Sequence, residues 1–212
     1  HIKLSDFDLL KELYEHIPAS IISKIAKKHF SHIDDEWSRK NEVKGYIFPK
    51  VKNILNYVED RRIDYFIYTN SPGYRDYYKA MYNRYFYSRA IDKGLKSNEY
   101  REENWESYEF RLINLHNKNT DLKALKALEV VYGAIDLKNI SRLTTTEDAL
   151  EVAIKVFKKV NTSCKTICTS LHCKLRLFLD RKKLFPLSRA VFSLSAWLRH
   201  KDRADTRQQR LF

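Results

Sequence analysis

Glycine and proline are scarce in this chain, and their scarcity limits the folds open to it. The 212 residues include four glycines and four prolines. A β-sandwich or barrel needs a turn roughly every eight to twelve residues, and those turns depend on these two residue types. Eight such residues are too few to form the turns of a sheet protein of this length. We therefore expect a mainly α-helical fold, a bundle of short amphipathic helices.

Helix start and stop signals recur along the chain. Pro18 is expected to open a helix, and Gly45 is expected to end the next one. Another helix is expected from Pro49, and the pair Thr145 and Asp148 predicts a capping box at the start of a later helix.

The segment "IDYFIYT", residues 63–69, is rich in β-branched and aromatic residues, which favour strands. An isolated strand has nothing to pair with, so helix is favoured here too. A minor strand near 63–69 is the most sheet that we expect.

The net charge of +13 is unevenly distributed. Residues 161–212 hold 12 Lys/Arg against three Asp, whereas residues 1–160 hold 28 basic and 24 acidic residues. We expect a helical core domain over 1–160 and a basic amphipathic helical segment over 161–212, with a disordered end. A concentrated positive charge is typical of proteins that bind nucleic acid or an anionic membrane.

The basic segment predicts a nucleic-acid-binding surface, since its Lys and Arg side chains can neutralise phosphates. An amphipathic helix packed on the domain with its basic side in solvent is the alternative. An anionic membrane surface or an acidic protein would also suit this charge. The candidate binding residues here are Lys174, Arg176, Arg181, Lys182, Lys183, Arg189, Arg199 and Arg203.

Six tyrosines fall between Tyr74 and Tyr87, in one predicted helix that begins after Ser71 and ends at Gly94. Tyrosines at helical spacing indicate either a buried stripe or a surface that stacks on unpaired bases. We expect the tyrosines to be mainly core and the interleaved basic residues to face a ligand. Those candidate binding residues are Arg75, Lys79, Arg84 and Arg89. The aromatic content favours RNA or a single strand over duplex DNA.

Arg111 and His116 have the spacing R-x4-H. This spacing resembles that of metal-independent helical ribonucleases of the HEPN class. The resemblance implies that His116 moves a proton and Arg111 stabilises charge on the transition state, at a site between two protomers. Leu112 stands where that class often has a polar residue. A ribonuclease with Arg111 and His116 as catalytic residues is therefore the alternative function, and a helical adaptor for protein or membrane is a third.

Other motifs give weaker indications. Residues 21–41 could form a helix-turn-helix, but their turn lacks glycine and carries three consecutive acids. Cys164, Cys168, His172 and Cys173 lack the paired spacing of structural zinc sites, so no metal or other cofactor is expected. Three closely spaced cysteines fit a reducing compartment such as the cytoplasm. No apolar run is long enough to span a bilayer, and no signal peptide is visible.

Overall fold

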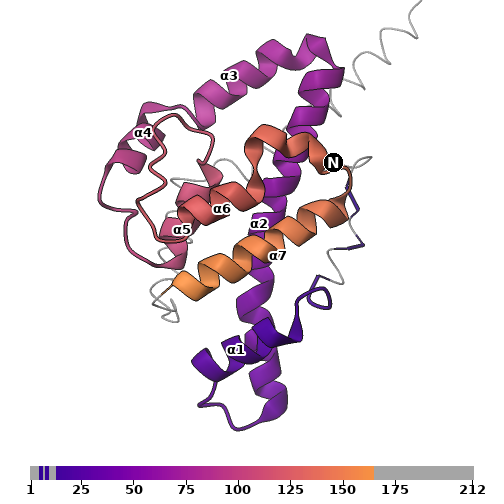
Figure 1. The fold of residues 1–212 in the computed structure, drawn as a ribbon, viewed down its shortest axis with the longest axis vertical. Helices are drawn as coiled ribbons and strands as arrows, with labels where there is room; N and C mark the ends of the chain where they lie inside the picture. The colour runs from indigo at the N-terminus through magenta and orange to yellow at the C-terminus, as the bar shows by residue number, and fades with distance from the viewer. Residues whose placement is uncertain (1–4, 7, 10–12, 165–212) are drawn as a thin grey trace, which may run out of the picture. The chain divides into compact units, whose positions relative to one another are not determined.

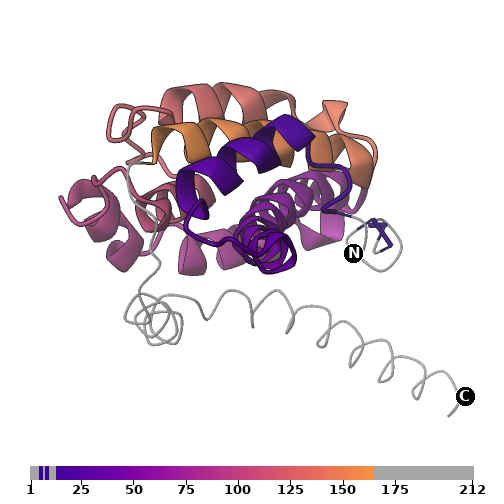
Figure 2. The same ribbon diagram turned by 90° about the horizontal axis from the view of Figure 1, so that it is seen from below.

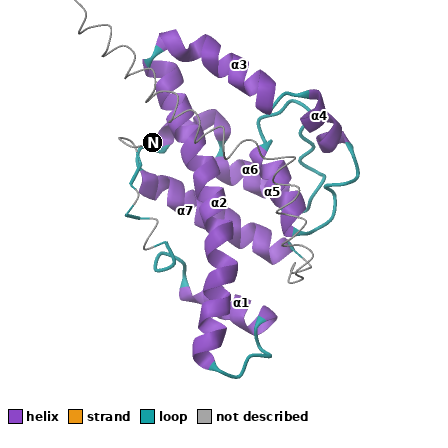
Figure 3. Cartoon of the chain, turned by 180° about the vertical axis from the view of Figure 1, so that it is seen from behind, coloured by secondary structure: helices purple, strands orange, loops and turns teal. Residues whose placement is uncertain are grey.

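The computed structural model describes residues 5–6, 8–9 and 13–164. The chain divides into two units after residue 167, and all described residues lie in the first. Within them the chain forms seven α-helices, two short 3-10 helices and no strand, so the predicted mainly α-helical fold is confirmed (Figure 3). The elements are α1 (Ala19–His29), α2 (Glu36–Asn70), η1 (Pro72–Tyr74), α3 (Arg75–Tyr85), α4 (Arg89–Lys96), α5 (Trp105–Ile113), α6 (Leu128–Ile135), η2 (Leu137–Arg142) and α7 (Thr146–Ser163).

The helix α2 runs unbroken through 35 residues (Figure 1). The predicted stop at Gly45, the predicted start at Pro49 and the possible strand over 63–69 are therefore wrong, because all three lie inside it. A glycine and a proline inside a helix cost about 1 and 3 kcal/mol. One apolar face that extends past both positions outweighs this cost, and its buried side chains are Val43, Ile47, Val51, Ile54 and Val58.

The main core lies between α2 and α7, which cross near the middle of α2 (Figure 1). Seen from below, α1, α6 and α7 lie on the same side of α2 (Figure 2). The buried face of α7 contributes Ala149, Leu150, Ala153, Val156, Phe157 and Val160. Burying such side chains is the main favourable term in folding, at roughly 25 cal/mol per Å² of apolar surface.

A buried ion pair joins α2 to the start of α7. The Glu59 carboxylate accepts two hydrogen bonds from Arg62, at 2.7 and 2.8 Å. It also accepts one from the Thr146 hydroxyl at 2.9 Å, and Arg62 donates to the Thr144 carbonyl. Ser5 donates to Glu59 as well, so the pair anchors the N-terminal segment. Because the Glu59 carboxylate accepts four hydrogen bonds and Arg62 is paired with it, we assign this pair a structural role.

The capping box predicted at the start of α7 is confirmed. The Thr145 hydroxyl accepts from the Asp148 amide, and the Asp148 carboxylate accepts from the Thr145 amide. The helix α1 follows Pro18 as expected, although Pro18 occupies the N-cap position. The helix α7 continues past Asn161 to Ser163, and the proposed boundary between domains at that point stays a prediction.

Arg142 closes the carboxyl end of α6. Asp136 follows α6 in the left-handed conformation, with φ of 49°. The Arg142 guanidinium donates to the carbonyls of Ala134 and Ile135, and also to those of Asp136 and Asn139. A single side chain thus satisfies carbonyls that have no partner within the helix.

The predicted helix from Ser71 to Gly94 is wrong, because three elements occupy this stretch. The helix α3 ends at Tyr85, and the Ser88 hydroxyl accepts from the Ile91 amide to begin α4. Gly94 lies inside α4, where a Cβ atom would lie 2.8 Å from the Phe110 ring. Glycine at this position therefore allows the close approach of α4 to α5.

None of the helices in the described part of the chain is long and apolar enough to cross a bilayer.

Candidate nucleic-acid interface

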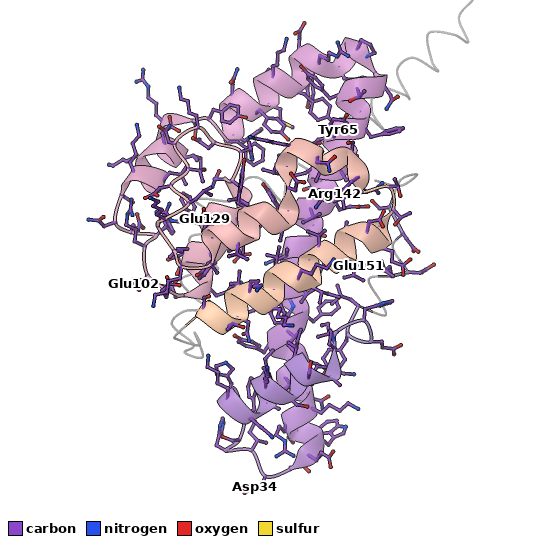
Figure 4. The ribbon with its side chains drawn as sticks, viewed as in Figure 1. Asp34, Tyr65, Glu102, Glu129, Arg142 and Glu151 are labelled. Carbon is purple, nitrogen blue, oxygen red and sulfur yellow. The ribbon has the colours of Figure 1, made fainter. Side chains whose placement is uncertain are left out.

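Six large aromatic side chains are exposed on the last turns of α2, in η1 and α3, and in the turn after α3. We call them the exposed aromatic group, and they are Tyr65, Phe66, Tyr68, Tyr74, Tyr77 and Tyr87. Each has about two-fifths or more of its surface in solvent, from 39% for Tyr77 to 48% for Phe66. Tyr65 lies at the opposite end of the unit from Asp34 (Figure 4). A concentration of exposed rings on one region indicates a binding surface.

Exposed basic side chains lie along α3 and α4, next to these rings. From Ser71 to Lys96 the chain has six Lys/Arg against two Asp. We call the six exposed residues the α3–α4 basic surface, and they are Arg75, Lys79, Arg84, Arg89, Lys93 and Lys96. This set includes the four basic residues that the sequence predicted for this region. Of these four, Arg75 contacts a ring of the exposed aromatic group, and Lys79, Arg84 and Arg89 are exposed on α3 and α4.

Two contacts show how closely the rings and charges are mixed. The Arg75 guanidinium lies 5.3 Å from the centre of the Tyr68 ring and donates to the Tyr68 carbonyl at 3.0 Å. The Arg84 guanidinium lies 5.4 Å from the Tyr85 ring. Arginine on an aromatic face holds the ring in a fixed orientation while its charge stays exposed. The surface can therefore offer flat rings and positive charges to one ligand.

The tyrosine stripe of α3 is divided between core and surface. Tyr78 is buried and Tyr82 is half-buried, whereas Tyr74 and Tyr77 are exposed. The Tyr82 hydroxyl donates to the Asp64 carboxylate at 2.8 Å and accepts from Arg61. These contacts fix α3 on the last turns of α2. The expectation of a mainly buried stripe therefore holds for its inner tyrosines and fails for its outer ones.

A buried charge network supports the surface from beneath. Arg61 and Asp64 form an ion pair at 2.9 Å. Burial disfavours the Arg61 charge, but Asp64 and the neighbouring tyrosines raise its pKa above the ordinary value. Burial raises the pKa of Asp64 and that of Tyr82, which keeps the Tyr82 hydroxyl protonated. Replacing Arg61 or Asp64 alone would leave an unpaired buried charge.

Arg111 is completely buried. Its guanidinium donates to the Tyr100 carbonyl at 2.5 Å and to the Leu95 carbonyl at 3.5 Å. These bonds hold the loop between α4 and α5, and burial lowers the Arg111 pKa. In this position Arg111 contacts backbone rather than a surface open to RNA.

His116 lies in the turn after α5, among three aromatic rings. Its ring centre is 4.7 Å from Phe86, 5.2 Å from Tyr82 and 5.6 Å from Tyr87. Neither of its ring nitrogens has a hydrogen-bond partner among the described residues. Burial, with a smaller effect of Arg61, lowers the His116 pKa to about 3. The catalytic role of Arg111 and His116 stays a prediction, and a buried Arg111 and a His116 that stays neutral give it no support.

Lys50 of α2 is a second side chain with unusual chemistry. Its amine donates to the Tyr46 carbonyl and lies 3.7 Å from the centre of the Tyr46 ring. Burial lowers the Lys50 pKa to about 8. The cavity beside it, lined also by Trp105 and Leu112, measures about 20 Å³. That volume holds about one water, so we assign no reaction to Lys50.

The remaining sequence candidates lie outside the described residues. They are the basic positions Lys174, Arg176, Arg181, Lys182, Lys183, Arg189, Arg199 and Arg203, together with Cys168, His172 and Cys173. Cys164 is described and buried, and burial raises its thiol pKa to about 11. Within the described ranges no three His, Cys, Asp or Glu side chains cluster as a metal site would require.

The sequence reasoning missed the aromatic residues at the end of α2. The sequence favours a helix over Tyr65, Phe66 and Tyr68, and it gives no indication that these rings are exposed, as they are on α2. The signal that could have identified them is the loss of apolar helical spacing after Ile63, the last buried residue of α2.

No protein-family model, curated protein or solved structure matches this chain.

Proposed function

We propose that this protein binds single-stranded nucleic acid, with RNA favoured, through the exposed aromatic group and the α3–α4 basic surface. The observation that carries the proposal is the presence of six exposed rings beside six exposed Lys/Arg. Unpaired bases stack on aromatic rings, and Lys and Arg neutralise the phosphates between them. A duplex hides the faces of its bases, so this surface suits single strands better. The basic residues from Lys174 to Arg203 are proposed to extend the electrostatic contact.

The test measures anisotropy of a labelled twelve-nucleotide uridine RNA with the full chain. Each stacked ring contributes about 1–3 kcal/mol, so Tyr74→Ala with Tyr77→Ala should weaken binding at least about tenfold. Trp37→Ala is the matched control, because Trp37 is 74% exposed in the first turn of α2, at the other end of that helix. Equal effects of the two variants would refute the assignment of the binding surface.

Salt dependence tests the basic component separately. For single strands the slope of log affinity against log salt is about −0.7 for each neutralised phosphate. Arg84→Ala with Arg89→Ala should therefore make the slope shallower by about 1.4, and Lys155→Ala, at an exposed position of α7, should leave it unchanged. Substituting Arg176, Arg181, Lys182 and Lys183 by Gln tests the C-terminal contribution in the same way. Binding to phosphatidylserine vesicles with none to RNA would assign the surface to a membrane instead.

A further inference from the structure

A cavity of about 370 Å³ opens where the end of α3 meets α4 and the turn after α5. It is lined by Asn83, Tyr87, Asp92, His116, Asn117 and Lys118. Its volume falls in the range of about 300–1,000 Å³ that small-molecule sites occupy. Tyr87 also belongs to the exposed aromatic group, so the cavity continues the proposed binding surface.

One wall of the cavity is aromatic and contains polar atoms without partners. The Tyr87 ring is 41% exposed and lies edge-on to His116 at 5.6 Å. Neither His116 nitrogen is hydrogen-bonded within the described ranges. A neutral imidazole has one donor and one acceptor, and buried polar atoms normally find a partner.

The rest of the lining offers a carboxylate, an amide and an amine. The Asp92 carboxylate accepts from the Asn117 amide at 3.0 Å, which holds it in place. Hydrogen bonds from Asn117 and Asn119 lower the Asp92 pKa, so it is an ionised acceptor. Asn83 and Lys118 are exposed, and neither side chain makes a hydrogen bond or ion pair with any other residue that the structure describes. Both remain available to a ligand.

We propose that the cavity holds one nucleobase that carries an exocyclic amino group. Tyr87 stacks on the base, Asp92 accepts from the amino group, and Lys118 binds the adjacent phosphate. Uracil has no amino group, and its one free N–H lies between two carbonyl oxygens that a carboxylate repels. The assignment rests on the proposed function and adds to it a preference for adenine, cytosine or guanine over uracil at one position.

The experiment compares twelve-nucleotide uridine RNA with the same RNA carrying one central adenosine, using the full chain. A hydrogen bond to a charged group contributes about 1.5–3 kcal/mol, so the adenosine RNA should bind about tenfold more tightly. Asp92→Ala should abolish this preference, because it removes the acceptor. Glu129→Ala is the matched control, because Glu129 is exposed on α6 outside the cavity (Figure 4), and it should keep the preference. If Asp92→Ala melts early, Tyr87→Ala replaces it and should also remove most of the preference, since the Tyr87 ring holds the base against Asp92.

The outcomes distinguish a failure of the cavity assignment from a failure of the proposed function. Equal affinities for the two RNAs, with binding intact, would overturn the base assignment alone. If neither RNA binds, the proposed function fails, and adenosine monophosphate is then titrated while amide resonances of Asn83 and Lys118 are followed. Saturable shifts that Tyr87→Ala removes would assign the cavity to a free mononucleotide. Absence of such shifts would overturn the cavity proposal as well.

Discussion

The Tyr82 hydroxyl of α3 donates a hydrogen bond to the Asp64 carboxylate of α2 at 2.8 Å. The same hydroxyl accepts from Arg61, whose guanidinium pairs with Asp64. Arg61 also lies 5.0 Å from the centre of the Tyr82 ring. One tyrosine therefore completes a buried network and fixes the helix that carries the proposed binding surface.

Removing only this hydroxyl should destabilise the protein. Tyr82→Phe removes one hydrogen-bond donor from Asp64 and one acceptor from Arg61 while their ion pair remains, at a cost of about 1–3 kcal/mol in the free energy of unfolding. Tyr74→Phe is the control, since Tyr74 is exposed, and its effect should stay within about 0.5 kcal/mol. Urea unfolding followed by circular dichroism measures both. Similar values for the two variants would contradict the network.

The buried His116 predicts a dependence of stability on pH. Its pKa is about 3 in the folded protein and 6.5 ordinarily, so between these values the unfolded chain binds more protons. Stability should therefore fall as pH falls below about 6.5, by about 2 kcal/mol at pH 5 from this residue. His116→Phe should remove that part of the pH dependence, and exposed His32→Gln should retain it. Urea unfolding at pH 5 and 7.5 provides the comparison, and identical pH profiles for both variants would refute it.

Two glycines should respond to alanine in opposite directions. At Gly94 a Cβ would lie 2.8 Å from the Phe110 ring, which itself stacks on Tyr100 at 3.9 Å. Overpacking of this kind costs about 1–3 kcal/mol, so Gly94→Ala should lower the melting temperature. Gly133→Ala, in open space on α6, should raise stability by up to about 1 kcal/mol. The close approach of α4 to α5 would be contradicted by a neutral Gly94→Ala.

Arg142 should stabilise α6 through the carbonyls that it caps. Arg142→Met keeps much of the aliphatic side chain and removes four hydrogen bonds to carbonyls of residues 134–139. Because water can replace some of these bonds at a partly exposed site, we expect a loss of about 1–3 kcal/mol. Lys138→Met, an exposed change in the same segment, provides the comparison in thermal unfolding. Equal melting temperatures for the two variants would show that the cap is dispensable.

Local sequence signals predicted the fold class and some helix starts. Scarce turn formers led to the mainly helical fold, and Thr145 with Asp148 led to the start of α7, because both signals act within a few residues. The signals at Gly45 and Pro49 predicted the wrong helix ends, because the cost of keeping each in a helix is local whereas the compensating burial comes from α1 and α7 across the core. Spacing along one chain does not reveal such a partner.

The candidate site was predicted in part. The basic residues of α3 were identified because charge predicts exposure well. Which tyrosines are buried and which are exposed was not predicted, because it depends on hydrogen bonds from the inner tyrosines to Arg61 and Asp64. The pair Arg111 and His116 shows the same limit, since R-x4-H spacing gives no information about burial. An arginine that donates to backbone carbonyls and one that faces solvent can occupy the same motif in the sequence.

The uninterrupted α2 has a consequence for how the protein can change. Its 35 residues extend on the order of 50 Å, and its buried positions end at Ile63 while its exposed rings begin at Tyr65. The proposed recognition rings and the main core therefore lie on different parts of one helix. Variants of Tyr65, Phe66 and Tyr68 that alter the proposed ligand preference can accumulate with little effect on stability, so selection can act on specificity and on stability almost independently.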